Sequence, residues 1–102
     1  MSLPHEIKLD PKLLQGDARE IARLWVTHRG PATVFLAPGH LADPAMFGML
    51  LVDTARHAAR AYAQALGLSE EEALQRLLLG FDAERGTPTS ALSTPDDRKD
   101  RH

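Results

Sequence analysis

The chain has 102 residues, a formal net charge of −2 and no cysteine. This length fits a single domain, and without cysteine there can be no disulfide, thiolate metal site or cysteine nucleophile. The chain has no excess of positive charge that would attract nucleic acid or an anionic membrane, so neither is expected as a partner. The start "MSLPHEIKLD" lacks a signal-peptide pattern. The longest apolar run, residues 49–52, is far below the about 20 residues of a membrane span, so we expect a soluble, cytoplasmic protein.

The N-terminal part of the chain predicts a β-hairpin. A short extended piece at 6–9 and a loop come first. Residues 18–28, "AREIARLWVTH", fit either a helix capped by Asp17 with Glu20 as its capping-box partner, or a strand. The strand is favoured over 21–28, because a turn cluster, "HRGPA", and the strand-like "TVFLA" at 33–37 follow directly.

Two helices are predicted next, over 44–66 and 70–84. The loop "PGHLADP" ends in Asp43 and Pro44, which suit the N-cap and first position of a helix. Gly67 can end the first helix in the left-handed conformation, and Ser69 with Glu72 forms a capping box for the second. Helical spacing predicts that each helix buries one stripe. These stripes are Phe47, Leu51, Ala55, Ala58, Tyr62, Ala65 and Leu66 in the first helix, and Leu74, Leu77, Leu78 and Phe81 in the second.

These elements predict an α+β fold: a single domain, 1–86, in which a β-hairpin or small antiparallel sheet packs against two C-terminal helices. The aromatic residues, about one per element, are expected in the core. They are Trp25, Phe35, Phe47, Tyr62 and Phe81. Residues 87–102 are rich in Pro, Ser, Thr and charge, which predicts a disordered tail.

The candidate site residues are His40, Asp53 and His57. Asp53 and His57 stand at i, i+4 and can touch on a helix surface, as half a metal site or as a carboxylate-oriented base. Neighbouring arginines at 56 and 60 oppose a bound cation. His40 lies in the loop before this helix, about 15–20 Å along the helix axis from the pair. We therefore interpret the pair as an exposed surface contact, with no metal and no cofactor; a small-molecule or metal-binding protein using the three residues is the alternative.

The sequence shows no motif for catalysis and little support for DNA binding. It contains no glycine-rich phosphate loop, no H-E-x-x-H and no nucleophile elbow, and its serines lie at the terminus, at a helix cap and in the tail. The helical hairpin could suggest a DNA-binding motif, but its second helix begins with three glutamates that would repel phosphate. The sequence therefore favours a protein that is not an enzyme and has no catalytic residues.

The first half of the 44–66 helix predicts a homodimer interface. Its apolar residues cover nearly the whole circumference of the helix, and a helix that is apolar all round is buried all round. A second copy would cover the apolar side chains that a small domain leaves exposed on the far side of this helix. The alternative is a monomer in which residues 1–17 fold over the methionines. The predicted interface comprises Met46, Phe47, Met49 and Leu50, with Leu79 as a second contact.

Part of the sequence resembles a known group of proteins. "DTARHAARAYAQ" followed by "SEEEAL", together with the upstream "AREIARLWVTHRGPATVFLAP", is similar to a small proteobacterial domain-of-unknown-function family over about residues 18–86. The resemblance implies a cytoplasmic bacterial protein and transfers no catalytic or binding residue. The function expected is therefore that of a homo-oligomeric protein–protein interaction module, which could also bind a further protein.

Deletion of the C-terminal tail should leave the domain intact. Residues 87–102 carry only Ala91 and Leu92 as apolar residues, too few to pack. We expect a change in melting temperature of no more than about two degrees, measured by calorimetry. Loss of soluble expression would show that the tail belongs to the fold.

Overall fold

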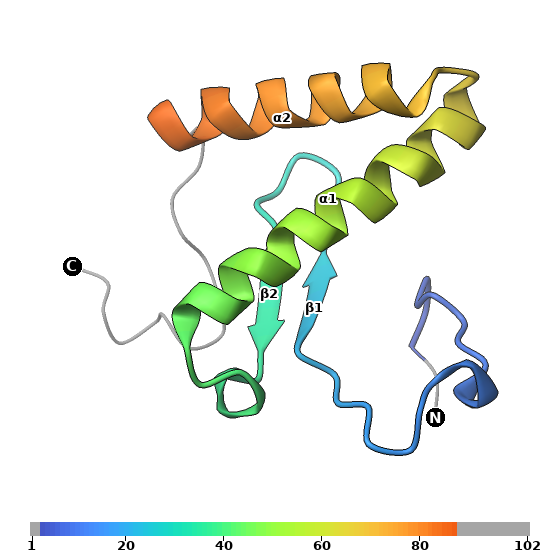
Figure 1. Ribbon diagram of the computed structural model, residues 1–102, viewed down its shortest axis with the longest axis vertical. Helices are drawn as coiled ribbons and strands as arrows, with labels where there is room; N and C mark the ends of the chain where they lie inside the picture. Colours follow the sequence, from blue (N-terminus) through green and yellow to red (C-terminus); the bar gives the residue numbers. More distant parts are fainter. Residues whose placement is uncertain (1–2, 88–102) are drawn as a thin grey trace.

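A computed structural model describes residues 3–87 of the protein, and it confirms the predicted α+β class, with two strands and two long helices (Figure 1). In chain order the elements are η1 (Pro11–Leu13), β1 (Ala22–Trp25), β2 (Thr33–Leu36), η2 (Pro38–His40), α1 (Pro44–Leu66) and α2 (Glu70–Gly86). The extended piece predicted at 6–9 does not form a strand. The tail predicted at 87–102 lies, apart from Thr87, outside the described residues.

The two strands form an antiparallel hairpin, which confirms the strand interpretation of the region before the turn. Arg23 pairs with Phe35 and Trp25 with Thr33 in this register. The N–H of Gly30 donates to the carbonyl of Thr27 at 3.2 Å and closes a turn within the connection. β1 is shorter than the predicted 21–28, because this turn begins at its C-terminal side.

Both helices begin, and α1 also ends, where their capping residues predict. Asp43 accepts a hydrogen bond from the N–H of Ala45 at 2.9 Å, and the side chain of Ser69 accepts one from the N–H of Glu72 at 3.0 Å. Gly67 takes a φ of 72° and ends α1, since the left-handed region costs an L side chain about 1–2 kcal/mol. α2 continues to Gly86, two residues beyond the prediction. No helix within residues 3–87 is both long and apolar enough to cross a membrane.

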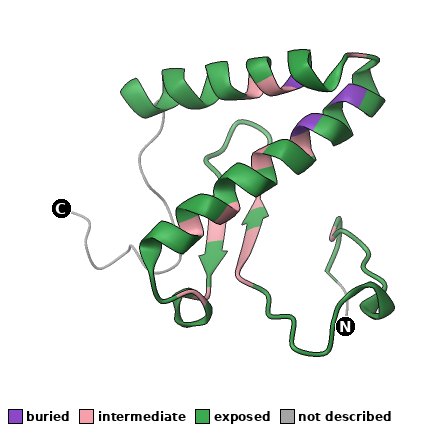
Figure 2. Ribbon diagram, viewed as in Figure 1, coloured by how far each residue is buried: buried purple, intermediate pink, exposed green. Residues whose placement is uncertain are grey.

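The helices pack on each other close to their linker and separate away from it (Figure 1). Only three described residues are buried, Ala59, Ala63 and Ala73, and they cluster at the linker end of the pair (Figure 2). Leu74 packs against them. Small side chains let the two backbones approach closely there, but the contact is short.

The prediction of the core is therefore wrong for many of its residues. Phe35, Tyr62 and Phe81 are exposed rather than buried, and so are the stripe residues Leu51 and Leu66. The stripe of α2 is only partly covered, because α2 leaves α1 before Leu78 and Phe81 can reach it. Helical periodicity correctly marked apolar faces, but it could not show that no element of the same chain covers them.

The hairpin and the helix pair are joined mainly through one short region. Close packing between regular elements occurs within each pair, α1 with α2 and β1 with β2, in the part of the chain that is described. The sheet reaches the helices through the loop after β2, where Ile21, Leu36 and Leu41 surround a hollow beside Phe47 of α1. The described chain is thus two small, open units with little core between them.

Two glycine substitutions should shift stability in opposite directions. Gly67→Ala should lower the free energy of unfolding by about 1–2 kcal/mol because of the left-handed backbone. Gly80→Ala, inside α2 with no atom within 4 Å of the added Cβ, should raise it by about 0.5–1 kcal/mol. Urea denaturation of both variants measures this, and a neutral Gly67→Ala would contradict the conformation of the α1–α2 linker.

Candidate contact site on the hairpin

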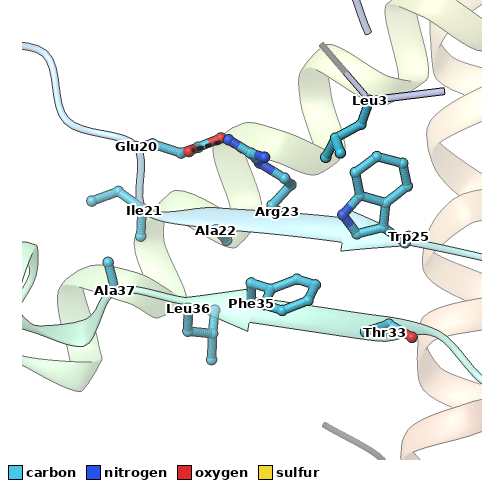
Figure 3. Close-up of a pocket in the computed structure, with 10 residues that line it drawn as sticks. All are labelled: Leu3, Glu20, Ile21, Ala22, Arg23, Trp25, Thr33, Phe35, Leu36 and Ala37. Atoms are coloured by element: carbon cyan, nitrogen blue, oxygen red, sulfur yellow. Dashed lines mark hydrogen bonds and ion pairs between the residues drawn. The ribbon is translucent and has the colours of Figure 1, made fainter. Parts of the chain in front are cut away.

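A shallow groove of about 510 Å³ runs across one face of the hairpin. Arg23 and Trp25 of β1 and Thr33 and Phe35 of β2 lie on one face of the hairpin, because side chains alternate across a sheet, and they line the groove (Figure 3). Ala22 and Leu36, of the other parity, also line it. Leu3 of the N-terminal segment reaches the same groove beside Trp25 (Figure 3). The lining is mostly apolar, with one hydroxyl and the ion pair of an arginine with a glutamate.

Arg23 is the charged centre of this groove. Its guanidinium donates to both carboxylate oxygens of Glu20, from Nε at 3.0 Å and from Nη2 at 2.8 Å, and lies 3.8 Å from Glu6. The hydrogen bond from Arg23 lowers the pKa of the Glu20 carboxyl below its usual range, and the same bond raises the pKa of Arg23. Both groups are fully charged at neutral pH and balance each other, so the pair orients a planar guanidinium and holds no proton for catalysis.

The residues proposed for a metal or small-molecule site do not meet in one chain. His40 lies in η2, whereas Asp53 and His57 lie on α1, and all three are exposed. Residues 3–87 contain no cluster of three or more His, Asp or Glu side chains that could hold a metal ion. Asp43, in the same loop as His40, is used as the N-cap of α1.

The predicted interface residues divide into two groups. Met46, Met49 and Leu79 are exposed, with Met49 at 70%. Phe47 and Leu50 are partly buried, and Phe47 lines the hollow of about 210 Å³ between the hairpin loop and α1. Met49 stands about 200° from Phe47 around the helix, so it points away from the hairpin. The first half of α1 therefore has one covered side and one open side.

A family model matches residues 2–89, and its description is a domain of unknown function, DUF5076. The chain belongs to the DUF5076 family. No curated protein matches it.

A solved structure of similar fold comes from the photosynthetic bacterium Rhodopseudomonas palustrus CGA009. That protein, provisionally named a pyruvate dehydrogenase, is 39% identical in sequence, and its structure matches with a TM-score of 0.67. The match covers 92% of this chain and 96% of the other. The two chains thus share one architecture along nearly their whole length.

The hairpin groove of this DUF5076 protein was not predicted from its sequence. Glu20 was considered only as a capping residue of the alternative helix, whereas in the structure it binds Arg23. One signal was present: Ile21, Arg23 and Trp25 alternate along a predicted strand, which places them on one face. Which residues of β2 lie opposite Arg23 and Trp25 depends on the hairpin register, and the loop between the strands sets that register.

Substitution of His57 should have little effect on folding. The side chain is exposed on α1, so His57→Gln should change the free energy of unfolding by less than about 0.5 kcal/mol. Ala59→Gln, two residues away, is the control; Ala59 is only 3% exposed, and a large polar side chain there should separate the helices. A loss of about 2 kcal/mol or more for His57→Gln would indicate a buried, hydrogen-bonded site.

Proposed function

We propose that this protein is a homodimeric protein–protein interaction module of the bacterial cytoplasm, with a second copy of itself as its first partner. One observation carries the proposal: the described chain buries three alanines, while leucines, methionines and aromatic rings on all of its main elements stay exposed. The bacterial relative and the lack of cysteine fit this setting.

The energetics of such a core favour association. A buried methyl group contributes about 0.8 kcal/mol, which is no more than the about 1–2 kcal/mol needed to order the backbone of one residue. Three alanine methyl groups cannot by themselves maintain a domain. Exposed apolar surface on this scale is rare in monomers and marks contact sites, so a partner that covers it would supply the missing stabilisation.

The first half of α1 is the proposed centre of the interface. Phe47 faces the hairpin loop, and Met46 and Met49 are left open at 51% and 70% exposure. Among the described residues, the N-terminal segment leaves both methionines open and reaches the hairpin groove through Leu3. A second copy related by a two-fold axis can place the same methionine surface against this one, which is the commonest arrangement for small oligomers.

Leu79 is the proposed second contact. It is 72% exposed and stands about 200° around α2 from the partly buried Leu77, so it points away from α1. An isolated exposed leucine is ordinary, and its part in the proposal is therefore smaller than that of the methionines.

Enzymatic and ligand-binding alternatives receive less support from the described residues. His40 stands apart from Asp53 and His57, and the groove lining offers an ion-paired Glu20 rather than a free base. The Rhodopseudomonas relative is provisionally named a pyruvate dehydrogenase, but the titratable side chains of the described groove, Arg23 and Glu20, are paired with each other. A metal-binding role would require ligands from two chains.

Light scattering and one substitution test this proposal. At micromolar concentration the wild type should have twice the 11.2 kDa of one chain, and Met49→Glu should weaken the dimer by placing a charge in an apolar contact. Gln64→Glu, which adds the same charge at an exposed position on α1, is the matched control and should leave the mass unchanged. A wild-type monomer would refute the dimer, whereas a Met49→Glu dimer of unchanged affinity would place the interface elsewhere.

A further inference from the structure

The outer edge of β1 is an open hydrogen-bonding edge. Ala37 donates its N–H to the carbonyl of Ile21 at 2.8 Å, so these two residues form a hydrogen-bonded pair. Such pairs alternate with non-bonded pairs along an antiparallel ladder, and Arg23–Phe35 and Trp25–Thr33 are therefore bonded pairs. The N–H and C=O groups of Ala22 and Leu24 consequently point away from β2, toward the free edge.

No backbone group of the described residues pairs with this edge. The N-terminal turn comes close, but its recorded contacts are with side chains: Glu6 lies 3.8 Å from Arg23, and Leu3 lies beside Trp25 (Figure 3). Leu24 and Val26, on the opposite face of the strand, are 70% and 81% exposed. The edge therefore combines free backbone groups with uncovered apolar side chains.

The two edges of the hairpin differ in their protection. Natural edges carry prolines, charges or bulges that block further pairing. β2 has Pro31 two residues before it and Pro38 two residues after it, whereas residues 18–29 around β1 contain neither proline nor glycine. β1 does carry one charge, Arg23, but it is paired with Glu20, and the β1 edge lacks the prolines that flank β2. A two-stranded sheet alone is marginal in water.

We propose that β1 pairs antiparallel with β1 of a second copy, with the two-fold axis at Leu24, to make a continuous four-stranded sheet. This rests on the homodimer proposed above for the number of copies, but it places the two-fold axis at the β1 edge instead of at the α1 methionines, since Met49 points away from the hairpin. Leu24 would face Leu24 of the partner subunit, and Ala22 would face Val26 of the partner subunit. Apolar residues then meet on both sides of the axis, and the outward N–H and C=O groups satisfy one another.

The side chains on the groove face favour this register. With the axis at Leu24, Arg23 lies directly opposite Trp25 of the partner subunit in a non-bonded pair, where side chains come closest. A guanidinium held flat by Glu20 can stack on an indole ring. Moving the axis to Arg23 would instead place two arginines opposite each other, and like charges in that position are unfavourable.

Proline substitution tests which edge of the hairpin, that of β1 or that of β2, forms the interface. Leu24→Pro removes an N–H that has no partner within the chain, so the hairpin should survive, while the added strand loses hydrogen bonds. We expect its dimer dissociation constant to rise about tenfold or more, measured by analytical ultracentrifugation, with helical circular dichroism unchanged. Val34→Pro makes the same change on the outer edge of β2 and should leave the dissociation constant near that of the wild type.

A cysteine pair tests the register without relying on the proline variant. The chain has no cysteine, so Leu24→Cys provides a single thiol, and bonded pairs about 5.5 Å apart at Cα lie within the range of a disulfide. Mild oxidation should link Leu24→Cys into covalent dimers at low protein concentration, and Val34→Cys should stay unlinked.

The outcomes distinguish this inference from the proposed function. A monomeric wild type would overturn both. A dimeric wild type in which Leu24→Cys does not cross-link, or in which Val34→Pro rather than Leu24→Pro dissociates, would overturn the β1 interface and leave the dimer standing. Cross-linking of Leu24→Cys together with dissociation of Leu24→Pro would support both.

Discussion

The contact between α1 and α2 at their linker is the interaction on which the rest of the structure depends. Ala59 and Ala63 meet Ala73 there, and because these side chains are small the helix backbones approach closely next to the turn at Gly67. The salt bridge from Arg60 to Glu70, at 3.2 Å, spans the same end but is exposed and adds little. Beyond this contact the helices separate. Their larger apolar residues, which helical periodicity predicts to pack between the helices, therefore stay uncovered.

That separation leaves residues of the predicted core uncovered. Leu51, Tyr62 and Phe81 occupy the faces expected to be buried, yet they are exposed. The same holds for the hairpin, where Phe35 and Leu24 are uncovered on opposite faces. The described residues thus leave apolar faces on both units and bury three alanines, which is the basis of the proposed dimer.

The hairpin groove combines an ion pair with aromatic side chains. Arg23 and Glu20 neutralise each other through two hydrogen bonds, which favours the charged form of each and leaves neither available for proton transfer. Trp25 and Phe35 supply apolar area beside them. Such a mixture, aromatic rings with one oriented arginine, is typical of protein contact surfaces.

The sequence alone was sufficient for the hairpin and for both helices, though not for the piece at 6–9 or the exact end of α2. Asp43 with Pro44, Gly67 and Ser69 marked the helix ends because capping depends on neighbouring residues only, and "HRGPA" between two apolar runs marked the hairpin. Tertiary structure alone decided which apolar residues are covered, since helical period identifies a face but not its neighbour. It also separated His40 from Asp53 and His57 and brought Glu20 to Arg23, because the direction of a side chain depends on the strand register and on where the helices diverge.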